Sequence, residues 1–500
     1  MLTEDALLKL QNGSDVRGVA IEGVAGESVN LTAEAVNRIA SGFVKFLSDK
    51  FGKAPSALKI TIGNDSRISA PQIKFSVCQA LIANGVTVVD CGLASTPAMF
   101  MSTIFEEIKA DGAIMLTASH LPFNRNGMKF FTSQGGLEKN DITAVLKNAA
   151  TQEEKFSDTS AVQTYDLISR YSAHLRKIIC DTLGKDKPFT GMKILVDAGN
   201  GSGGFFVEKI LEPLGANTTG SQFLEPDGMF PNHIPNPEDK KAMESVKKAV
   251  LDNRADLGLI FDTDVDRAGA VLSDGKEISR NALIAMIAAI VAPDYPAGTI
   301  VTDSITSDEL TTFLEKNLGL KHHRFKRGYK NVINESIRLN KNGVVSPLAI
   351  ETSGHGALSE NYFLDDGAYL AVKILIAAAK LHAQGKNLSD LITDLKYPAQ
   401  SEEYRLKIFG VEDFKTYGQK VLEEFKARAV EKNLSLAEPN FEGVRINFDG
   451  GWALLRLSLH DPNMPLNIES NSSDNFRKIF SSVKILLNGF DHLDLSSFKI

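Results

Sequence analysis

The chain has 500 residues, of which 43% are hydrophobic and 23% are charged, and its formal net charge at pH 7 is −7. This composition is ordinary for a globular protein, and the acidic balance argues against nucleic acid as the main partner. The longest apolar run, residues 282–292, is too short to cross a bilayer, so no membrane partner is expected. At about 150 residues per domain, the length predicts three or four domains.

Two further features concern the compartment. The three cysteines are widely spaced and match neither a disulfide framework nor a zinc site: Cys78, Cys91 and Cys180. The N-terminus has no basic segment followed by an apolar one, so no signal peptide is expected. Together these features predict a cytoplasmic protein.

The N-terminal third alternates between two hydrophobic patterns. Strands are predicted over residues 58–63, 86–90 and 113–116, and a helix over residues 71–84. This alternation predicts an α/β first domain. The glycine-flanked loop before it holds Arg17, a fixed donor of the kind that binds phosphate.

The third of these strands leads into residues 117–129, which contain several turn formers that predict an ordered loop: Pro122, Asn124, Asn126 and Gly127. Ser119 therefore lies where a strand ends. His120 is a candidate base beside it, and Arg125 and Lys129 supply positive charge. A hydroxyl nucleophile needs a base and an anion-holding group of this kind, although an ordinary surface turn is the alternative.

A helix is predicted over residues 167–183, then a strand over 192–197 and a helix over 205–214. The turn between the last two reads G-x-G-x-x-G, with an acidic residue downstream: Gly199, Gly201, Gly204 and Glu225. This pattern suggests a dinucleotide site. A tight strand-to-helix turn explains it better, because no clear second strand precedes the acidic residue.

Residues 255–261 read as a buried strand that ends at three alternating carboxylates, Asp262, Asp264 and Asp266. On an extended backbone, alternate side chains share a face, so the three would converge. Three like charges need a cation, and hard oxygen ligands favour Mg²⁺. A calcium EF-hand is excluded, because Arg267 and Ser273 stand where it needs Gly and Glu. A solvated acidic turn is the alternative.

Further along, a helix is predicted over residues 281–292 and a strand over 299–302. Another helix and strand lead to the basic segment around Lys326. A strand over residues 344–350 ends in a glycine-rich loop that suits the recognition of sugar hydroxyls, with Glu351, Ser353 and His355. An apolar helix follows over residues 368–381.

Near Tyr397 the pattern changes to that of an α+β domain. Strands are predicted over residues 404–409, 444–448, 452–457 and 465–468, and helices over 412–432 and 473–487. Its loop at Arg456 could hold an anion. The predicted domains are residues 1–155, 156–278, 279–397 and 398–500.

Three motifs in this order and spacing resemble the α-D-phosphohexomutase family, and most closely its phosphomannomutase/phosphoglucomutase group: T-A-S-H-L-P from Thr117, D-T-D-V-D-R from Asp262 and E-T-S-G-H from Glu351. The resemblance implies four domains around a central cleft. Three would share an α/β core, and the C-terminal one would be a smaller α+β domain.

The resemblance also implies roles for single residues. Ser119 would carry a phosphoryl group and share Mg²⁺ with Asp262, Asp264 and Asp266. The reaction cleft would be lined by Arg17, His120, Lys129, Arg267 and His355. The sugar phosphate would be bound by Lys326, Glu351, Ser353, Arg456, Ser458 and His460.

The implied activity is an isomerase that interconverts hexose 1-phosphate and hexose 6-phosphate, of mannose, glucose or both. It would pass through a phosphoserine enzyme and a hexose 1,6-bisphosphate, which would also act as activator. Small sugar phosphates would be its partners, and the protein would be a monomer or homodimer.

The sequence departs from the family pattern in three loops. The serine loop usually has Asn where Leu121 stands, and Thr352 is unusual in the sugar loop. The phosphate loop usually reads R-P-S-G-T-E-P, and four of its residues differ here: Leu457, Leu459, His460 and Asp461.

Three alternatives remain at this level. The chain could be a phosphoglucosamine mutase of the same family. It could be a haloacid-dehalogenase-like phosphatase or mutase with Asp262 as nucleophile and Asp365 and Asp366 as the later pair. It could also be a non-catalytic sugar-phosphate-binding protein.

Overall fold

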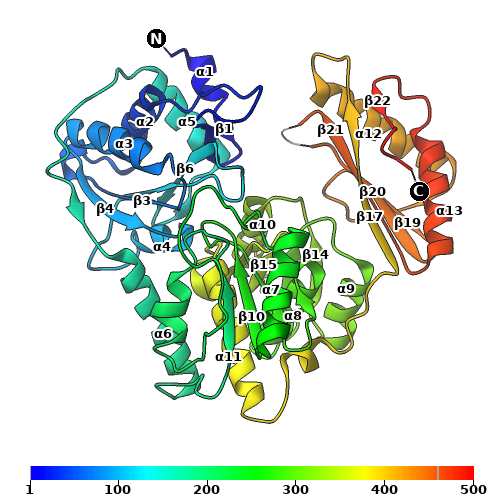
Figure 1. Ribbon diagram of the computed structural model, residues 1–500. Coiled ribbons are helices and arrows are strands. Elements are labelled where there is room, and N and C mark those ends of the chain that lie inside the picture. The colour runs from blue at the N-terminus through cyan, green and yellow to red at the C-terminus, as the bar shows by residue number, and fades with distance from the viewer. Residues whose placement is uncertain (1, 459–460, 500) are drawn as a thin grey trace. The chain divides into compact units, whose positions relative to one another are not determined.

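The structure is a computed structural model that describes residues 2–458 and 461–499 (Figure 1). The chain divides into two compact units. The first comprises Met1–Ile290 with Ser353–Leu391, and the second comprises Val291–Thr352 with Ile392–Ile500. The four predicted domain boundaries stay a prediction. Among the described residues, no helix is long and apolar enough to cross a membrane.

The N-terminal part of the first unit is built on a mixed sheet with strand order β1-β2-β6-β5-β3-β4-β8, and β7 pairs with β6. The neighbours β5, β3 and β4 are parallel, whereas β6 runs antiparallel to both β5 and β2. The strands are β1 Gln11–Asn12, β2 Asp15–Val19, β3 Lys59–Asn64, β4 Thr87–Leu93, β5 Gly112–Leu116, β6 Arg125–Thr132, β7 Gly135–Gly136 and β8 Gln163–Thr164.

Helices α2, α3 and α5 pack together on one face of this sheet, and their apolar side chains form one core with the strands (Figure 1). The side chains of β3 point alternately to the two faces of the sheet. Ile60 and Ile62 enter that core, whereas the Thr61 hydroxyl on the other face forms a hydrogen bond with Ser102, which caps the end of α4. The helices are α1 Glu4–Leu8, α2 Ala33–Phe51, η1 Pro55–Ala57, α3 Ala70–Ala83, α4 Thr96–Met101, α5 Lys139–Ala150 and α6 Leu167–Leu183.

The rest of the first unit contains a smaller sheet with strand order β12-β11-β10-β9, in which β10 runs parallel to β9 and antiparallel to β11. The predicted helix after β9 is a short π-helical segment. The elements are β9 Ile194–Asp197, η2 Val207–Leu211, α7 Lys240–Asn253, β10 Leu257–Phe261, β11 Ala268–Leu272, β12 Glu277–Ile278, α8 Arg280–Val291, β16 Gly356–Leu358, η4 Ser359–Asn361, α11 Gly367–His382 and η5 Leu388–Ile392.

The second unit begins with three parallel strands, in which β13 lies between β14 and β15. The last of these begins later than predicted, because Pro347 has no backbone N–H for a ladder and Leu348 is the first strand residue. The elements are β13 Thr299–Thr302, α9 Asp308–Thr312, η3 Phe313–Asn317, β14 Lys321–Arg324, α10 Tyr329–Lys341 and β15 Leu348–Ile350.

The C-terminal part of the second unit is an antiparallel sheet with order β18-β19-β20-β21-β17-β22, whose core side chains pack with those of two helices. This is the α+β pattern predicted after Tyr397. The elements are β17 Gln400–Ile408, α12 Phe414–Glu431, β18 Ser435–Leu436, β19 Val444–Phe448, β20 Gly451–Leu455, β21 Asn463–Ser470, α13 Ser473–Leu487 and β22 Leu493–Asp494.

A buried glutamate on β21 predicts how the stability of this part depends on pH. Burial and the nearby Glu309 raise the pKa of Glu469 from 4.5 to about 7, although the Trp452 indole donates a hydrogen bond of 3.0 Å to its carboxylate. Because the folded state holds this proton more tightly than the unfolded state, stability falls as pH rises from about 4.5 to about 7.

We therefore expect Glu469→Gln to stabilise this part by up to about 3 kcal/mol at pH 8 and by less than about 1 kcal/mol at pH 5. Urea unfolding followed by the fluorescence of Trp452, the single tryptophan, measures this. The control is Glu423→Gln at an exposed position on α12. Equal stabilisation at both pH values would contradict the assignment.

Candidate active site

The predicted serine lies on a tight turn directly after β5. The hydroxyl of Thr117 accepts a 2.9 Å hydrogen bond from the Ser119 backbone N–H, and Ser119 has a φ of 52°, a left-handed conformation that is uncommon outside glycine. The loop is shorter than the sequence suggested, because β6 begins at Arg125. Asn126 and Gly127 are strand residues, since pairing with β2 and β5 outweighs their turn preference.

The aspartate motif joins β10 to β11. The convergence was expected on the condition of an extended backbone, and that condition is not met: the segment is a turn in which Val265 has a φ of 64° and the Arg267 N–H donates to Asp262 Oδ1 at 3.2 Å. The carboxylates of Asp262, Asp264 and Asp266 nevertheless converge. The turn, rather than strand alternation, brings them together.

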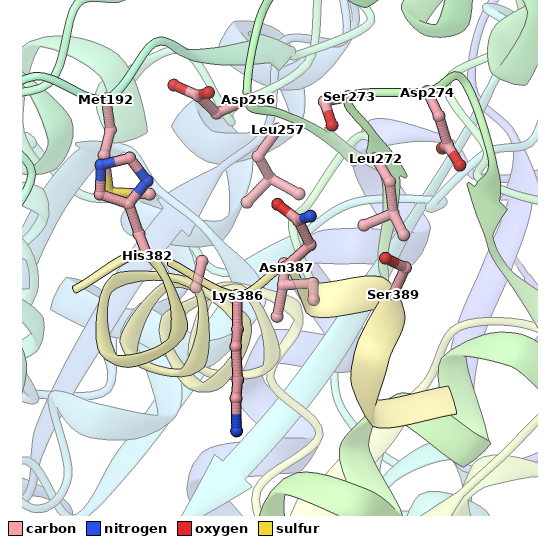
Figure 2. Close-up of a pocket in the computed structure, with 12 residues that line it drawn as sticks. Met192, Asp256, Leu257, Leu272, Ser273, Asp274, His382, Lys386, Asn387 and Ser389 are labelled. Carbon is pink, nitrogen blue, oxygen red and sulfur yellow. The ribbon is translucent and has the colours of Figure 1, made fainter. Parts of the chain in front are cut away.

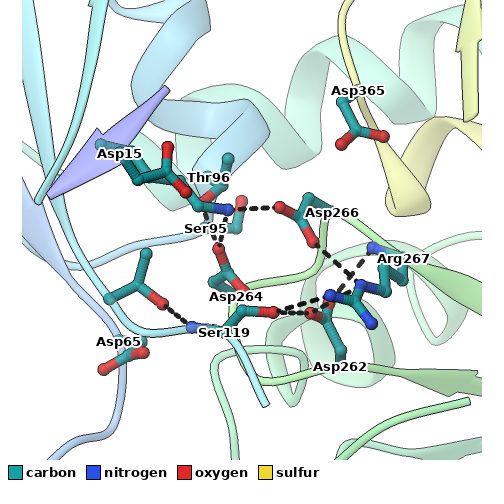
Figure 3. Close-up of polar contacts among 12 residues, drawn as sticks. Asp15, Asp65, Ser95, Thr96, Ser119, Asp262, Asp264, Asp266, Arg267 and Asp365 are labelled. Atoms are coloured by element: carbon teal, nitrogen blue, oxygen red, sulfur yellow. Dashed lines mark hydrogen bonds and ion pairs between the residues drawn. The ribbon is translucent and has the colours of Figure 1, made fainter. Parts of the chain in front are cut away.

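These three carboxylates form a buried cluster (Figure 3). One oxygen atom from each lies within 4.8 Å of the others, and none of the three residues is more than 1% exposed. Lys129, on β6, donates to Asp264 Oδ2 at 2.8 Å and to Asp266 Oδ2 at 2.5 Å. The hydroxyl of Thr96 donates to the same Asp264 oxygen at 2.5 Å.

The charges in this cluster are not fully compensated. Burial and repulsion from Asp266 and Asp264 hold the pKa of Asp262 well above its ordinary value. Burial also opposes ionisation of Asp266, yet Lys129 and neighbouring cations keep its pKa below the ordinary range. The Oδ1 atoms of Asp264 and Asp266 are buried and accept no hydrogen bond from the described residues. Hard oxygen donors in this state suit a divalent cation.

Ser119 Oγ lies at the edge of the cluster. It donates to Asp262 Oδ2 at 3.0 Å, and Arg267 Nη2 donates to it at 3.3 Å. His120 Nδ1 is also 3.3 Å away. Burial, together with the charges of Arg267 and Arg17, lowers the pKa of His120 to about 2, so this imidazole is neutral.

His355 lies against the aspartate turn through a backbone bridge to Arg267. Its Nδ1 is 2.6 Å from Asp365 Oδ2 and 3.8 Å from Asp266 Oδ1. Burial opposes its protonation, but the carboxylates of Asp365 and Asp266 outweigh this and raise its pKa above 6.5. The pair is therefore a carboxylate-oriented imidazole, the arrangement that general bases use.

The remaining predicted residues of the first unit lie in two other segments. Arg17 is on β2, and its guanidinium donates to Asp15 at 2.9 Å with 17% of the side chain exposed. Ser353 is buried two residues before His355.

The residues predicted to bind the sugar phosphate belong mainly to the second unit. Glu351 Oε1 accepts from the Gly328 N–H at 2.6 Å, and Lys326 is exposed. Arg456 is 6% exposed and lies between two carboxylates, 3.7 Å from Glu403 Oε2 and 3.9 Å from Glu442 Oε1. The hydroxyl oxygen of Ser458 accepts from the Asp461 N–H at 3.2 Å. His460 lies outside the described residues.

Sequence reasoning misjudged one arginine and overlooked another. Arg125 is not the cation beside Ser119, because its guanidinium pairs with Glu27 at 2.6 Å. Arg67 is instead buried beneath the serine loop, where its guanidinium donates to the Ser119 carbonyl. The sequence did offer one sign of its importance: Arg67 follows the predicted strand over residues 58–63 by only four residues. Thr96 had no such signal.

The glycine-rich turn after β9 supports the aspartate turn rather than a nucleotide. A Cβ on Gly201 would lie 2.6 Å from the Thr263 carbonyl oxygen, and one on Gly204 would lie 2.4 Å from that of Leu224. The space that a pyrophosphate would need beside these glycines is therefore filled by the chain's own backbone.

A cavity of about 150 Å³ lies beside the smaller sheet of the first unit, at the end where β10 begins (Figure 2). It is lined by Leu257, which begins β10, by Leu272, which ends β11, and by His382 and Lys386. Because the aspartates follow the opposite end of β10, this cavity is separate from the carboxylate cluster.

Comparison with known proteins identifies the family. Three family profiles match in succession: phosphoglucomutase/phosphomannomutase alpha/beta/alpha domain I over residues 9–157, domain II over 169–275 and domain III over 279–397. The chain belongs to this family. It is therefore a phosphohexomutase, an isomerase of a kind that uses a metal ion, and the dehalogenase-like and non-catalytic alternatives fall away.

Related proteins match over nearly the whole length of this chain and of their own chains. The phosphomannomutase/phosphoglucomutase of Pseudomonas aeruginosa is 28% identical, over 95% of this chain and 96% of its own. The phosphoglucomutase/phosphomannomutase of Thermococcus kodakarensis is 29% identical, over 93% and 97%. A family protein from Burkholderia thailandensis shares the fold, with a TM-score of 0.78 at 24% identity over 98% of each chain.

The packing of Gly201 generates a prediction about the carboxylate cluster. With Mg²⁺ as the probe cation, we expect Gly201→Ala to weaken binding at least about tenfold, because the added Cβ displaces Thr263 between two of the aspartates. The control is Gly203→Ala, whose Cβ would meet mainly the Phe261 side chain, at 3.2 Å, and should change binding by less than about threefold. Calorimetric titration measures both, and equal affinities would contradict the prediction.

Proposed function

We propose that the protein interconverts hexose 1-phosphate and hexose 6-phosphate, with mannose or glucose as the sugar, through a phosphoserine at Ser119 and a hexose 1,6-bisphosphate. The observation that supports this most directly is Ser119 Oγ, 3.0 Å from Asp262 in a buried cluster of three carboxylates. The names of the relatives, phosphomannomutase and phosphoglucomutase, supply the two sugars.

Asp262, Asp264 and Asp266 would hold Mg²⁺ together with an oxygen of the group on Ser119. When bound, this ion would neutralise charge that develops on the transferred phosphoryl group. The buried Oδ1 atoms of Asp264 and Asp266, which accept no hydrogen bond from the described residues, support this assignment. Hexose 1,6-bisphosphate would serve as the activator that phosphorylates Ser119.

The transfer would then need positioning and a proton acceptor. The bond between phosphorus and Ser119 Oγ would break as a bond to a sugar hydroxyl oxygen forms; the hydroxyl would lose one proton and Ser119 Oγ would take up one, so that the serine hydroxyl is restored. Arg267, which donates to Ser119 Oγ, and Lys129 would hold the anionic group. His355, oriented by Asp365, is the favoured proton acceptor, and Arg17 and His120 would complete the wall of the site.

The sugar and its other phosphate would be held by Lys326, Glu351, Ser353, Arg456, Ser458 and His460. Arg456 is kept buried by Glu403 and Glu442, and a phosphate would replace these weak ion pairs with bidentate contacts. Amino sugar phosphates are the second candidate substrate, and the assay described next includes one of them. The monomeric or dimeric state and the cytoplasmic location stay predictions.

The deciding experiment is a coupled assay with the 1-phosphates of glucose, mannose and glucosamine, each with its 1,6-bisphosphate. We expect turnover of at least one of the first two. Turnover of glucosamine 1-phosphate alone would favour the phosphoglucosamine mutase alternative, and no turnover of any would refute the proposal.

The role of Ser119 is tested by substitution. Ser119→Ala should lose at least about 10²-fold in kcat, because the group that accepts the phosphoryl is gone. Mass spectrometry of the wild type after incubation with bisphosphate should place one phosphoryl group on Ser119. Ser133→Ala, at an exposed turn, is the control. A label on Asp262, or an active Ser119→Ala protein, would contradict the assignment.

The metal is tested by removal. Chelation should abolish turnover, and Mg²⁺ should restore it. Asp264→Asn should weaken Mg²⁺ binding at least about tenfold, measured by calorimetry as well as by activity. Asp274→Asn, at an exposed turn after β11, should bind normally. Full activity in excess chelator would exclude this use of the cluster.

A further inference from the structure

A buried guanidinium lies at the centre of the serine loop. Arg67, which is 1% exposed, follows β3. Its Nη1 donates to the carbonyl oxygens of Pro122 and Arg125, each at 2.8 Å. Its Nη2 donates to the carbonyl oxygens of Leu121, at 2.7 Å, and of Ser119. The loop is thus wrapped around one side chain of another segment.

We propose that Arg67, oriented by Asp65, is the positioning residue that sets the catalytic geometry of Ser119, an inference that rests on the proposed role of Ser119 as phosphoryl carrier. Among the described residues, its hydrogen bonds go to loop carbonyls and its ion pair goes to Asp65, and the carboxylate of Asp264 acts on it only through its charge. It acts through the Ser119 carbonyl, which fixes the left-handed backbone that directs Oγ toward Asp262.

Only an arginine meets the geometry of this site. Four carbonyl dipoles converge with their negative ends together, and a planar fork of N–H groups can bond all of them at once. A lysine has the same charge, but its three donors radiate from one nitrogen atom. Substitution by lysine should therefore keep the charge that holds the loop in place, but the loop backbone should no longer adopt the same conformation.

Asp65 fixes the fork. Its Oδ1 accepts from the Arg67 backbone N–H at 2.9 Å, and its Oδ2 is 3.3 Å from Arg67 Nε. The Asp65 backbone N–H donates to the carbonyl of Leu116, the last residue of β5. The pair is therefore tied to the strand that delivers Ser119.

The far side of the guanidinium faces the segment after β9. The Phe230 ring centre is 5.3 Å from Arg67 Cζ, and a Cβ on Gly228 would lie 2.7 Å from Arg67 Cα. A cavity of about 520 Å³ separates the outer side of the serine loop, from His120 to Phe123, from this segment. That side of the loop borders the cavity, so the internal anchor bonds the loop backbone from the opposite side.

The test compares two buried arginines that both belong to the N-terminal part of the first unit. Arg38, on α2, is 5% exposed and likewise donates to three backbone carbonyls, those of Leu2, Ala149 and Ala150. We expect Arg67→Lys to lower kcat about 10²-fold, the scale of a 1 Å misplacement, with KM and Mg²⁺ affinity within about threefold. Arg38→Lys should lower the melting temperature but leave kcat within about threefold.

Two measurements keep the test decisive. If Arg67→Lys does not fold, Asp65→Asn replaces it, with the same expected loss of kcat at constant KM. Hydrogen exchange by mass spectrometry should show faster exchange over residues 117–124 in either variant, but not in Arg38→Lys. Normal kcat in Arg67→Lys, or in Asp65→Asn where Arg67→Lys does not fold, would overturn the inference.

This design also separates the inference from the proposed function. If the wild type neither turns over sugar phosphates nor accepts a phosphoryl group on Ser119, the proposed function has failed, whatever the arginine does. If the wild type is active and Arg67→Lys differs from it only in melting temperature, as Arg38→Lys does, the function stands and the positioning role is refuted.

Discussion

The structure of the site depends on the repulsion among three buried carboxylates. Because one oxygen of each carboxylate lies within 4.8 Å of the others, like charges on them would repel by at least roughly 3 kcal/mol per pair even at an effective dielectric constant of about 20. Lys129 and Arg267 supply two positive charges against three negative ones. A phosphoryl group on Ser119 would add nearly two more negative charges, and a divalent cation would bring the cluster nearer to neutrality.

This constraint bears on where Ser119 and the three aspartates lie in the fold. Ser119 follows the carboxyl end of β5, and the aspartates follow that of β10, the positions at which α/β sheets place their ligands. Strand ends let the chain turn sharply while the buried strand holds the turn. The positive φ values of Ser119 and Val265 are the local result, because each turn must aim side chains that an extended backbone would direct elsewhere.

The sequence predicted much of this arrangement, and its failures have physical causes. Strands and helices with strong periodicity, such as α6 and α13, matched their predicted ranges. Ser119 and the aspartates could be singled out because each motif directly follows a predicted buried strand. The turn that brings the aspartates together could not be read from the sequence, because alternating acidic residues also fit an extended backbone. Arg67 was overlooked because its partners are carbonyl oxygens, which every residue possesses and no motif reveals.

The bonding of Arg67 to backbone carbonyls also explains how the serine loop can differ from the family pattern in its side chains. Arg67 bonds the carbonyl oxygens of residues 119, 121, 122 and 125, so the side chain at position 121 takes no part in the anchor. Leu121 instead lines the cavity on the outer side of the loop. Its replacement of the usual Asn therefore changes the surface beside the serine without changing the backbone that presents it. A loop held by its carbonyls can vary in side chains while keeping one geometry, provided that the guanidinium beneath it stays.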